Sequence, residues 1–231
     1  MLSFNNTVVV ATLNRNKIPE IVDIMRIDGW QFHALRSFGV YDEPAETADS
    51  FEGNALIKAR AAAQRLRKTC ILADDSGLVV DALGGAPGIH SARYAGEKAR
   101  DVDNVDKLLS DLKGVPETKR SARFICVAAY IDEDGNEVLA RGVCEGRIAL
   151  EPRGAGGFGY DPVFLPDAPL ADGRTMAELS SEAKNLISHR ADALDKLTLL
   201  LDMHYEKLSG ELQPSPENLF PDDWSAPKDE Y

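Results

Sequence analysis

Two long runs of strand-forming residues near the middle of this 231-residue chain constrain its fold more than any other feature. Residues 122–131 and 137–150 are rich in apolar and β-branched side chains. The Asp134-Gly135 dipeptide between them is typical of a tight hairpin turn. We therefore expect two long antiparallel strands joined at this turn. A chain of this length can bury a sizeable core, and without an interior linker we expect a single two-lobed domain over residues 1–210.

The N-terminal part of the chain predicts a strand, a turn and a helix. The strand covers residues 7–11, and the helix begins after the segment from Thr12 to Lys17. Free backbone N–H groups and the positive end of the helix dipole make a helix start an anion site, and Lys17 adds a positive charge. The glycines and the Gly-Lys-Ser/Thr ending of a P-loop are missing. A simple helix cap formed by Asn14 or Asn16 is the alternative interpretation.

Two adjacent aspartates, Asp74 and Asp75, lie at the expected end of a short strand over residues 71–73, and another strand is expected over residues 78–83. Successive side chains of an extended chain point to opposite sides, so only one of the pair is expected to face a given cleft. That carboxylate is suited to bind Mg²⁺ or to act as a general base. A solvated turn, stabilised by local backbone hydrogen bonds, is the alternative.

A glycine-rich run over residues 154–159 satisfies the spacing G-x-G-x-x-G. Pro162 and a short apolar strand follow it where a dinucleotide-binding fold needs a helix, so we reject that fold. The loop still allows a ligand to approach the backbone, with Phe158 and Tyr160 as stacking surfaces. A plain hairpin connection is the alternative.

The last predicted helix begins with a group of polar residues. Ser188 is suited to cap it, and His189 and Arg190 then lie in its first turn as two hydrogen-bond donors beside a positive helix end. Lys184 lies just upstream. The alternative is one continuous helix from Ser181, with these charges on its solvated face.

The charge balance of the chain narrows its partners. There are 26 basic and 38 acidic residues, so the formal charge is −12. Long nucleic acids and anionic membranes are repelled by such a charge, and we expect neither as a partner. A small polyanionic substrate remains compatible, provided that its site is locally basic or holds a metal ion.

Three cysteines, Cys70, Cys126 and Cys144, each lie in an apolar run and are expected to be buried free thiols. The N-terminus lacks the features of a signal sequence or a membrane span, so we expect a cytoplasmic protein. Residues 211–231 contain four prolines and many acids, and we expect them to form an irregular acidic tail.

Five stretches, taken together, resemble the family of non-canonical purine nucleoside triphosphate pyrophosphatases, the Ham-like inosine/xanthosine triphosphate pyrophosphatases. They are, in order, ATLNRNK, SFEGNALIKA, LADDSGLVVDALGGAPGIHSARYAG, GGFGYDPVF and SSEAKNLISHRADAL. The resemblance implies an α/β fold with an elongated mixed β-sheet, flanking helices and two lobes around a nucleotide-binding cleft, assembled as a homodimer. It also implies Mg²⁺-dependent hydrolysis of ITP, dITP and XTP to the monophosphate and pyrophosphate, which keeps these nucleotides out of DNA and RNA.

The resemblance also implies roles for single residues. Asp75 would be the general base for the attacking water and would serve the metal. The residues that it assigns to substrate binding are Thr12, Leu13, Asn14, Arg15, Asn16, Lys17, Ser76, Phe158, Gly159, Tyr160, Asp161, Lys184, His189 and Arg190. The chain departs from the family at Gly53, where the family has an acid that helps to hold magnesium. Glu52, one residue earlier and so about 100° away on a helix, becomes the second candidate metal ligand.

Two other functions stay open at this stage. A non-hydrolytic nucleotide-binding regulator would bind nucleotides without forming product, which the loss of an acid at Gly53 makes conceivable. A related pyrophosphatase acting on modified pyrimidine nucleotides would differ only in its substrates.

Overall fold

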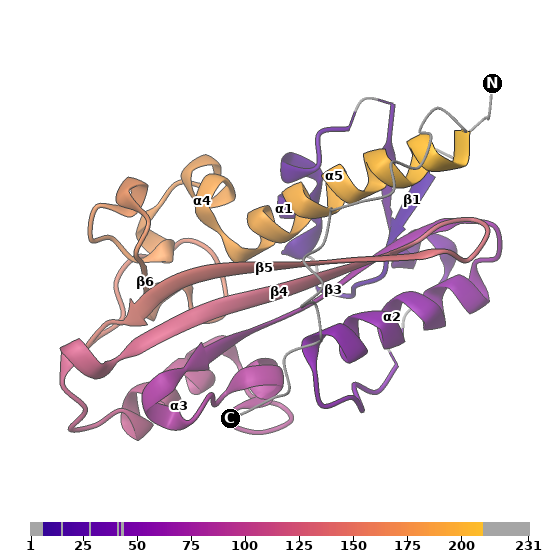
Figure 1. The fold of residues 1–231 in the computed structure, drawn as a ribbon. Coiled ribbons are helices and arrows are strands. Elements are labelled where there is room, and N and C mark those ends of the chain that lie inside the picture. The colour runs from indigo at the N-terminus through magenta and orange to yellow at the C-terminus, as the bar shows by residue number, and fades with distance from the viewer. Residues whose placement is uncertain (1–6, 15, 28, 41, 43, 210–231) are drawn as a thin grey trace, which may run out of the picture.

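The computed structural model describes residues 7–209, except residues 15, 28, 41 and 43. Its six strands form one mixed sheet in the order β2-β1-β3-β4-β5-β6 (Figure 1). The strands are β1 Thr7–Val10, β2 Gln31–Ala34, β3 Cys70–Val80, β4 Ser121–Ile131, β5 Glu137–Ile148 and β6 Phe164–Pro166. Strands β2, β1 and β3 are parallel, and β3 to β6 are antiparallel. The predicted tail, residues 211–231, lies outside the described residues.

The expected hairpin forms the backbone of the molecule. Strands β4 and β5 have 11 and 12 residues, and at about 3.3 Å per residue each spans roughly 36–40 Å. Gly135 turns the chain between them with φ = 91°. The prediction of two short strands around the paired aspartates is wrong, because β3 pairs with β4 without interruption from Ile71 to Val80. Three long strands therefore give the sheet its elongated form, as the resemblance implied.

Helices cover both faces of the sheet (Figure 1). They are α1 Lys17–Ile24, α2 Phe51–Arg65, α3 Asp101–Asp111, α4 Ser181–Ile187 and α5 His189–Ser209. Helices α1 and α5 pack on one face and α2 on the other, while α3 lies at the far half of the sheet. None of the helices in this part of the chain is long and apolar enough to cross a membrane.

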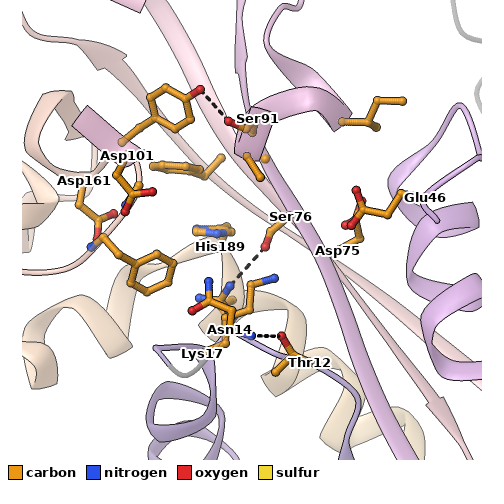
Figure 2. Close-up of a pocket in the computed structure, with 18 of the residues that line it drawn as sticks. Thr12, Asn14, Lys17, Glu46, Asp75, Ser76, Ser91, Asp101, Asp161 and His189 are labelled. Atoms are coloured by element: carbon orange, nitrogen blue, oxygen red, sulfur yellow. Dashed lines mark hydrogen bonds between the residues drawn. The ribbon is translucent and has the colours of Figure 1, made fainter. Parts of the chain in front are cut away.

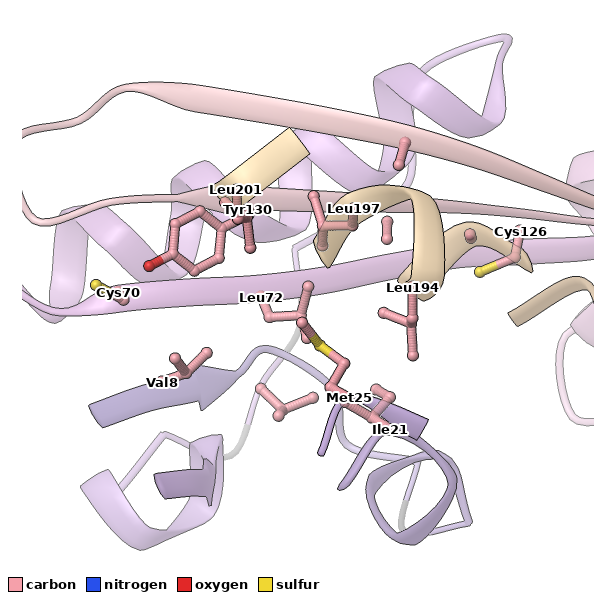
Figure 3. Packing of buried hydrophobic residues seen from close by; sticks show 14 residues of the cluster. Val8, Ile21, Met25, Cys70, Leu72, Cys126, Tyr130, Leu194, Leu197 and Leu201 are labelled. Atoms are coloured by element: carbon pink, nitrogen blue, oxygen red, sulfur yellow. The ribbon is translucent and has the colours of Figure 1, made fainter. Parts of the chain in front are cut away.

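The core is divided into three clusters that follow the two faces and the two halves of the sheet. Figure 3 shows the first, in which Leu194, Leu197 and Leu201 of α5 pack over Leu72 and Tyr130. A second cluster joins α2 to the opposite face, and a third lies between the far half of the sheet and α3. As expected, all three cysteines are buried thiols outside any disulfide bond.

Candidate active site

A cleft of about 220 Å³ lies where β1 ends beside β3. Ala11 N donates to Leu72 O at 2.7 Å, and the chain then leaves the sheet toward α1. Ligands of α/β proteins usually bind outside the carboxyl end of a parallel strand, and this cleft lies at the carboxyl end of β1. The predicted site residues that line it are Thr12, Asn14, Lys17, Asp75, Ser76, Phe158, Gly159, Tyr160, Asp161, Lys184, His189 and Arg190 (Figure 2). Leu13 and Asn16 do not line it, and Arg15 lies outside the described residues.

The two aspartates of β3 face opposite sides of the sheet, as the alternation of an extended strand requires. Asp74 lies on the same face as Leu72 and meets groups from α1 and α5. Asp75 lies on the face of Ala73 and meets α2. Only Asp75 of the pair lines the cleft, so the expectation that one carboxylate would face it is confirmed.

Asp74 is the buried centre of a charge network behind the cleft. Its Oδ2 is 2.9 Å from Lys17 Nζ and 3.1 Å from Arg190 Nη2, and it accepts a hydrogen bond from Ser76 Oγ at 3.1 Å. Burial by itself raises the pKa of Asp74, but the charges of Lys17 and Arg190 outweigh it and hold that pKa well below its ordinary value. Glu20 of α1 completes the network through ion pairs with Arg190 and, at 2.7 Å, with Lys184. Asp74 and Glu20 therefore hold three of the cations that line the cleft, namely Lys17, Lys184 and Arg190.

Asp75 forms a second network with groups that the sequence analysis did not single out. Lys58 Nζ lies 2.6 Å from Asp75 Oδ1 and 2.6 Å from Glu46 Oε1, and Arg93 Nη1 lies 2.8 Å from Glu46 Oε2. Burial raises the pKa of Asp75, and Lys58 opposes that shift only in part. Burial also acts on Glu46, but Lys58 and Arg93 outweigh it and lower its pKa. The two carboxylates differ in their readiness to take a proton, which favours Asp75 as the base.

The position of Glu52 contradicts its assignment as a metal ligand. Its carboxylate contacts Arg141 Nη1 at 2.9 Å outside the cleft, because one residue of rotation turns it away from Asp75. Glu46 lies opposite Asp75 instead (Figure 2). No group of three or more His, Cys, Asp or Glu side chains within the described residues is arranged to hold a metal. Two carboxylates in a cleft that also presents several cations nevertheless fit Mg²⁺, which usually takes one or two carboxylates together with phosphate oxygens and water.

The segment after β1 is ordered by its own side chains. Thr12 Oγ1 accepts a hydrogen bond from Asn14 N at 3.1 Å, and Asn14 Oδ1 accepts one from Asn16 N at 3.0 Å. Asn16 precedes α1 but forms no side-chain cap. The segment therefore does more than cap the helix, because it presents Thr12, Asn14 and Lys17 to the cleft.

The glycine-rich loop folds around Asp161 at the other end of the cleft. Asp161 Oδ2 accepts from Phe158 N at 2.9 Å and lies 2.7 Å from Lys184 Nζ, which also lies 4.6 Å from the centre of the Phe158 ring. Asp101, at the start of α3, accepts from Gly159 N at 2.7 Å. These bonds connect the loop to both α3 and α4, so it is more than a plain hairpin connection.

His189 presents a neutral ring to the cleft. The chain breaks between α4 and α5 at Ser188, whose Oγ accepts from Ala191 N at 3.1 Å, so the continuous-helix alternative is wrong. The imidazole stacks on Phe124 at 4.6 Å with 13° between the rings. Burial, reinforced by Arg190 and Lys184, lowers the pKa of His189 well below its ordinary value. A neutral imidazole has one N–H donor and one acceptor nitrogen, so it can donate to a carbonyl oxygen or accept from an amino group.

Sequence reasoning missed Glu46, Lys58, Asp101 and Phe124 as lining residues. One local signal was present: Lys58 shares the buried stripe of α2 with Ala55, Ala59 and Ala62, and a lysine is almost never buried without a partner. Glu46 lies in an irregular segment, so no periodicity in the sequence indicates where its side chain points.

Comparison with known proteins matches most of the chain to a single family. Residues 8–199 match the model of the Ham1 family. A dITP/XTP pyrophosphatase of Geobacillus kaustophilus is 48% identical over 204 residues, covering 88% of this chain and 96% of that protein. One from Bacillus subtilis is 46% identical over 194 residues, covering 84% and 96%. The structure of the Staphylococcus aureus Ham1 protein superimposes with a TM-score of 0.74 at 40% identity, covering 86% of this chain and 99% of that one.

Proposed function

This chain belongs to the Ham1 family, and from that premise we propose that it hydrolyses ITP, dITP and XTP to the nucleoside monophosphate and pyrophosphate. The observation that carries the proposal is the pairing of Asp75 and Glu46 about Lys58 in a cleft that also presents other cations. Those cations are Lys17, Lys184 and Arg190. Carboxylates that can hold a metal and activate water, next to cations that offset phosphate charge, are what hydrolysis of a triphosphate requires.

In this proposal the triphosphate lies against the segment that follows β1. The backbone N–H groups at the start of α1 and the ammonium of Lys17 supply positive potential there. Asp75 accepts the proton of the attacking water, a role that its raised pKa suits. Asp75 and Glu46 would hold Mg²⁺, which when bound supplies charge neutralisation of the phosphate oxygens. Lys58, already shared between both carboxylates, remains beside them to balance their charge.

The purine base is proposed to lie at the other end of the cleft, near Phe158 and Tyr160. The neutral His189 can donate to a 6-keto oxygen, and Arg190, which has only donors, has no favourable partner in the 6-amino group of adenine. Arg190 would be a second donor to the 6-keto oxygen, and Asp74, Glu20 and Ser76 hold its guanidinium at the wall of the cleft. Leaving a buried donor unpaired can cost about 10⁴-fold in specificity, so ATP should be a poor substrate. GTP shares the 6-keto group, so its rejection depends on the 2-amino group.

A substrate panel tests the proposal. Pyrophosphate release is measured for ITP, XTP, dITP, GTP, ATP and dTTP, with and without Mg²⁺. We expect fast hydrolysis of the first three in the presence of Mg²⁺ and slow hydrolysis of ATP and dTTP. Equal turnover of ATP and ITP would contradict the assigned selectivity. Thermal stabilisation by ITP without any product would indicate a nucleotide-binding regulator, and preference for dTTP a pyrimidine enzyme. The homodimer implied by the resemblance is part of the same proposal and is tested by sedimentation velocity.

A further inference from the structure

Helix α2 begins with an unusually close contact between its third residue and the preceding loop. A Cβ atom built on Gly53 would lie 2.5 Å from Ala48 Cβ and 3.1 Å from Ser50 Oγ. Neither neighbour can yield easily. Ala48 Cβ is attached directly to the backbone, and Ser50 Oγ is the helix cap that accepts from Gly53 N at 3.2 Å. Any side chain at position 53 therefore displaces the loop itself.

The same loop carries Glu46 to the cleft. Asn54, which is fully buried, accepts a hydrogen bond from Ala48 N through Oδ1 at 3.0 Å and so fixes the loop to α2. Glu46 lies two residues before Ala48, where its carboxylate contacts Lys58 and Arg93. A shift of the backbone at Ala48 is transmitted over this short distance to Glu46. The position of the loop thus decides the distance between the two carboxylates of the cleft.

We propose that Gly53 is a positioning residue that, by letting Ala48 pack directly against α2, sets Glu46 opposite Asp75 and so determines the affinity of the cleft for a divalent metal ion. The inference rests on the metal site of the proposed function. The space that a side chain at position 53 would need is filled by Ala48 in this chain. An acid therefore cannot be introduced there without moving the loop that carries Glu46.

Binding of Mn²⁺ to the full-length protein, followed by electron paramagnetic resonance without nucleotide, tests the inference. In Gly53→Ala we expect the Mn²⁺ dissociation constant to rise about tenfold or more, as for other changes that misplace a metal ligand. Alanine is a better helix former than glycine, so a loss of helix propensity does not explain this result. Adding Ala48→Gly removes the closest of these contacts, the one at 2.5 Å, and the double variant should return to within about threefold of the wild-type constant, since one methyl group then again fills the space between positions 48 and 53.

Glu52→Gln is the matched control, because Glu52 is next to Gly53 in sequence but its carboxylate faces Arg141. The Glu52→Gln protein should bind Mn²⁺ with the wild-type dissociation constant. A folded Gly53→Ala protein with wild-type Mn²⁺ affinity overturns the inference. If that single variant does not fold, the double variant decides, and weak Mn²⁺ binding there also overturns it. ITP hydrolysis is assayed separately. A wild-type protein that binds Mn²⁺ with the expected dependence on Gly53 but hydrolyses no nucleotide overturns the proposed activity and supports this inference. A wild-type protein that binds no Mn²⁺ overturns this inference, whereas the proposed activity is decided by ITP hydrolysis.

Discussion

Replacing Asp74 by asparagine should destabilise the protein and weaken nucleotide binding together, although Asp74 does not line the cleft. The carboxylate holds Lys17 at 2.9 Å and Arg190 at 3.1 Å. Asp74→Asn keeps the size of the side chain and removes its charge. Both cations then lose their shared anion, and we expect them to take up orientations that no longer fit a triphosphate.

The magnitude follows from burial and distance. The side chains of Asp74 and Arg190 are 1% and 3% exposed, and that of Lys17 is 14% exposed. With an effective dielectric constant of about 20, each pair gains roughly 5 kcal/mol of attraction, most of which offsets the removal of the charges from water. Removing one partner of a buried pair costs about 3–5 kcal/mol. We expect the free energy of unfolding to fall by about 3 kcal/mol, the lower end of this range, because Glu20 still pairs with Arg190.

Differential scanning calorimetry measures this loss. For a chain of this size 3 kcal/mol corresponds to a fall in Tm of roughly 6–12 °C. Asp134→Asn is the control, because it breaks the exposed pair with Lys68 and should shift Tm by less than about 2 °C. A variant of Asp74 that melts within about 2 °C of the wild type, or binds ITP with unchanged affinity, would contradict the role assigned to Asp74.

The same variant has a defined pH dependence. The folded pKa of Asp74 lies below its unfolded value, so its contribution to stability is complete above the unfolded pKa, about 3.9, and disappears as pH falls through the folded pKa. The difference in Tm between the wild type and Asp74→Asn should therefore stay constant from about pH 8 to pH 5 and narrow only in stronger acid.

Three further variants test the cleft. Asp75→Asn should lower kcat by about 10²–10⁴-fold, and steady-state kinetics showing wild-type kcat would remove Asp75 from the role of base. Glu46→Gln should raise the Mg²⁺ concentration needed for half-maximal activity by at least about tenfold, whereas Glu52→Gln should not; equal Mg²⁺ titrations of the two would contradict the assignment of Glu46. Asp101→Ala removes the acceptor for Gly159 N, and we expect KM for ITP to rise up to about tenfold at nearly constant kcat. Initial-rate measurements test this, and a fall in kcat at unchanged KM would contradict it.

The elements of the fold could be read from local patterns with few errors. The β4–β5 hairpin and the strand before Thr12 were predicted, and a helix start after Ser188 was one of two alternatives that the sequence left open. The one clear error, the division of β3 at its two aspartates, has a tertiary cause. Charged residues are rare inside a buried strand, and Asp74 is tolerated there only because Lys17 and Arg190 reach it from distant helices.

Local sequence encodes which side chains are available for chemistry, because motifs, strand alternation and helix starts each extend over a few neighbouring residues. How the charges of these side chains pair depends on contacts between elements that are distant in sequence. Arg190 meets Asp74 across 116 residues of sequence, and Glu46 meets Asp75 through Lys58. Glu52, closer to the family pattern in sequence, faces Arg141 instead. Burial and ion pairing depend on contacts between separate elements, so they set the pKa of Asp75 and the position of the metal carboxylates only after the sheet and its helices have assembled.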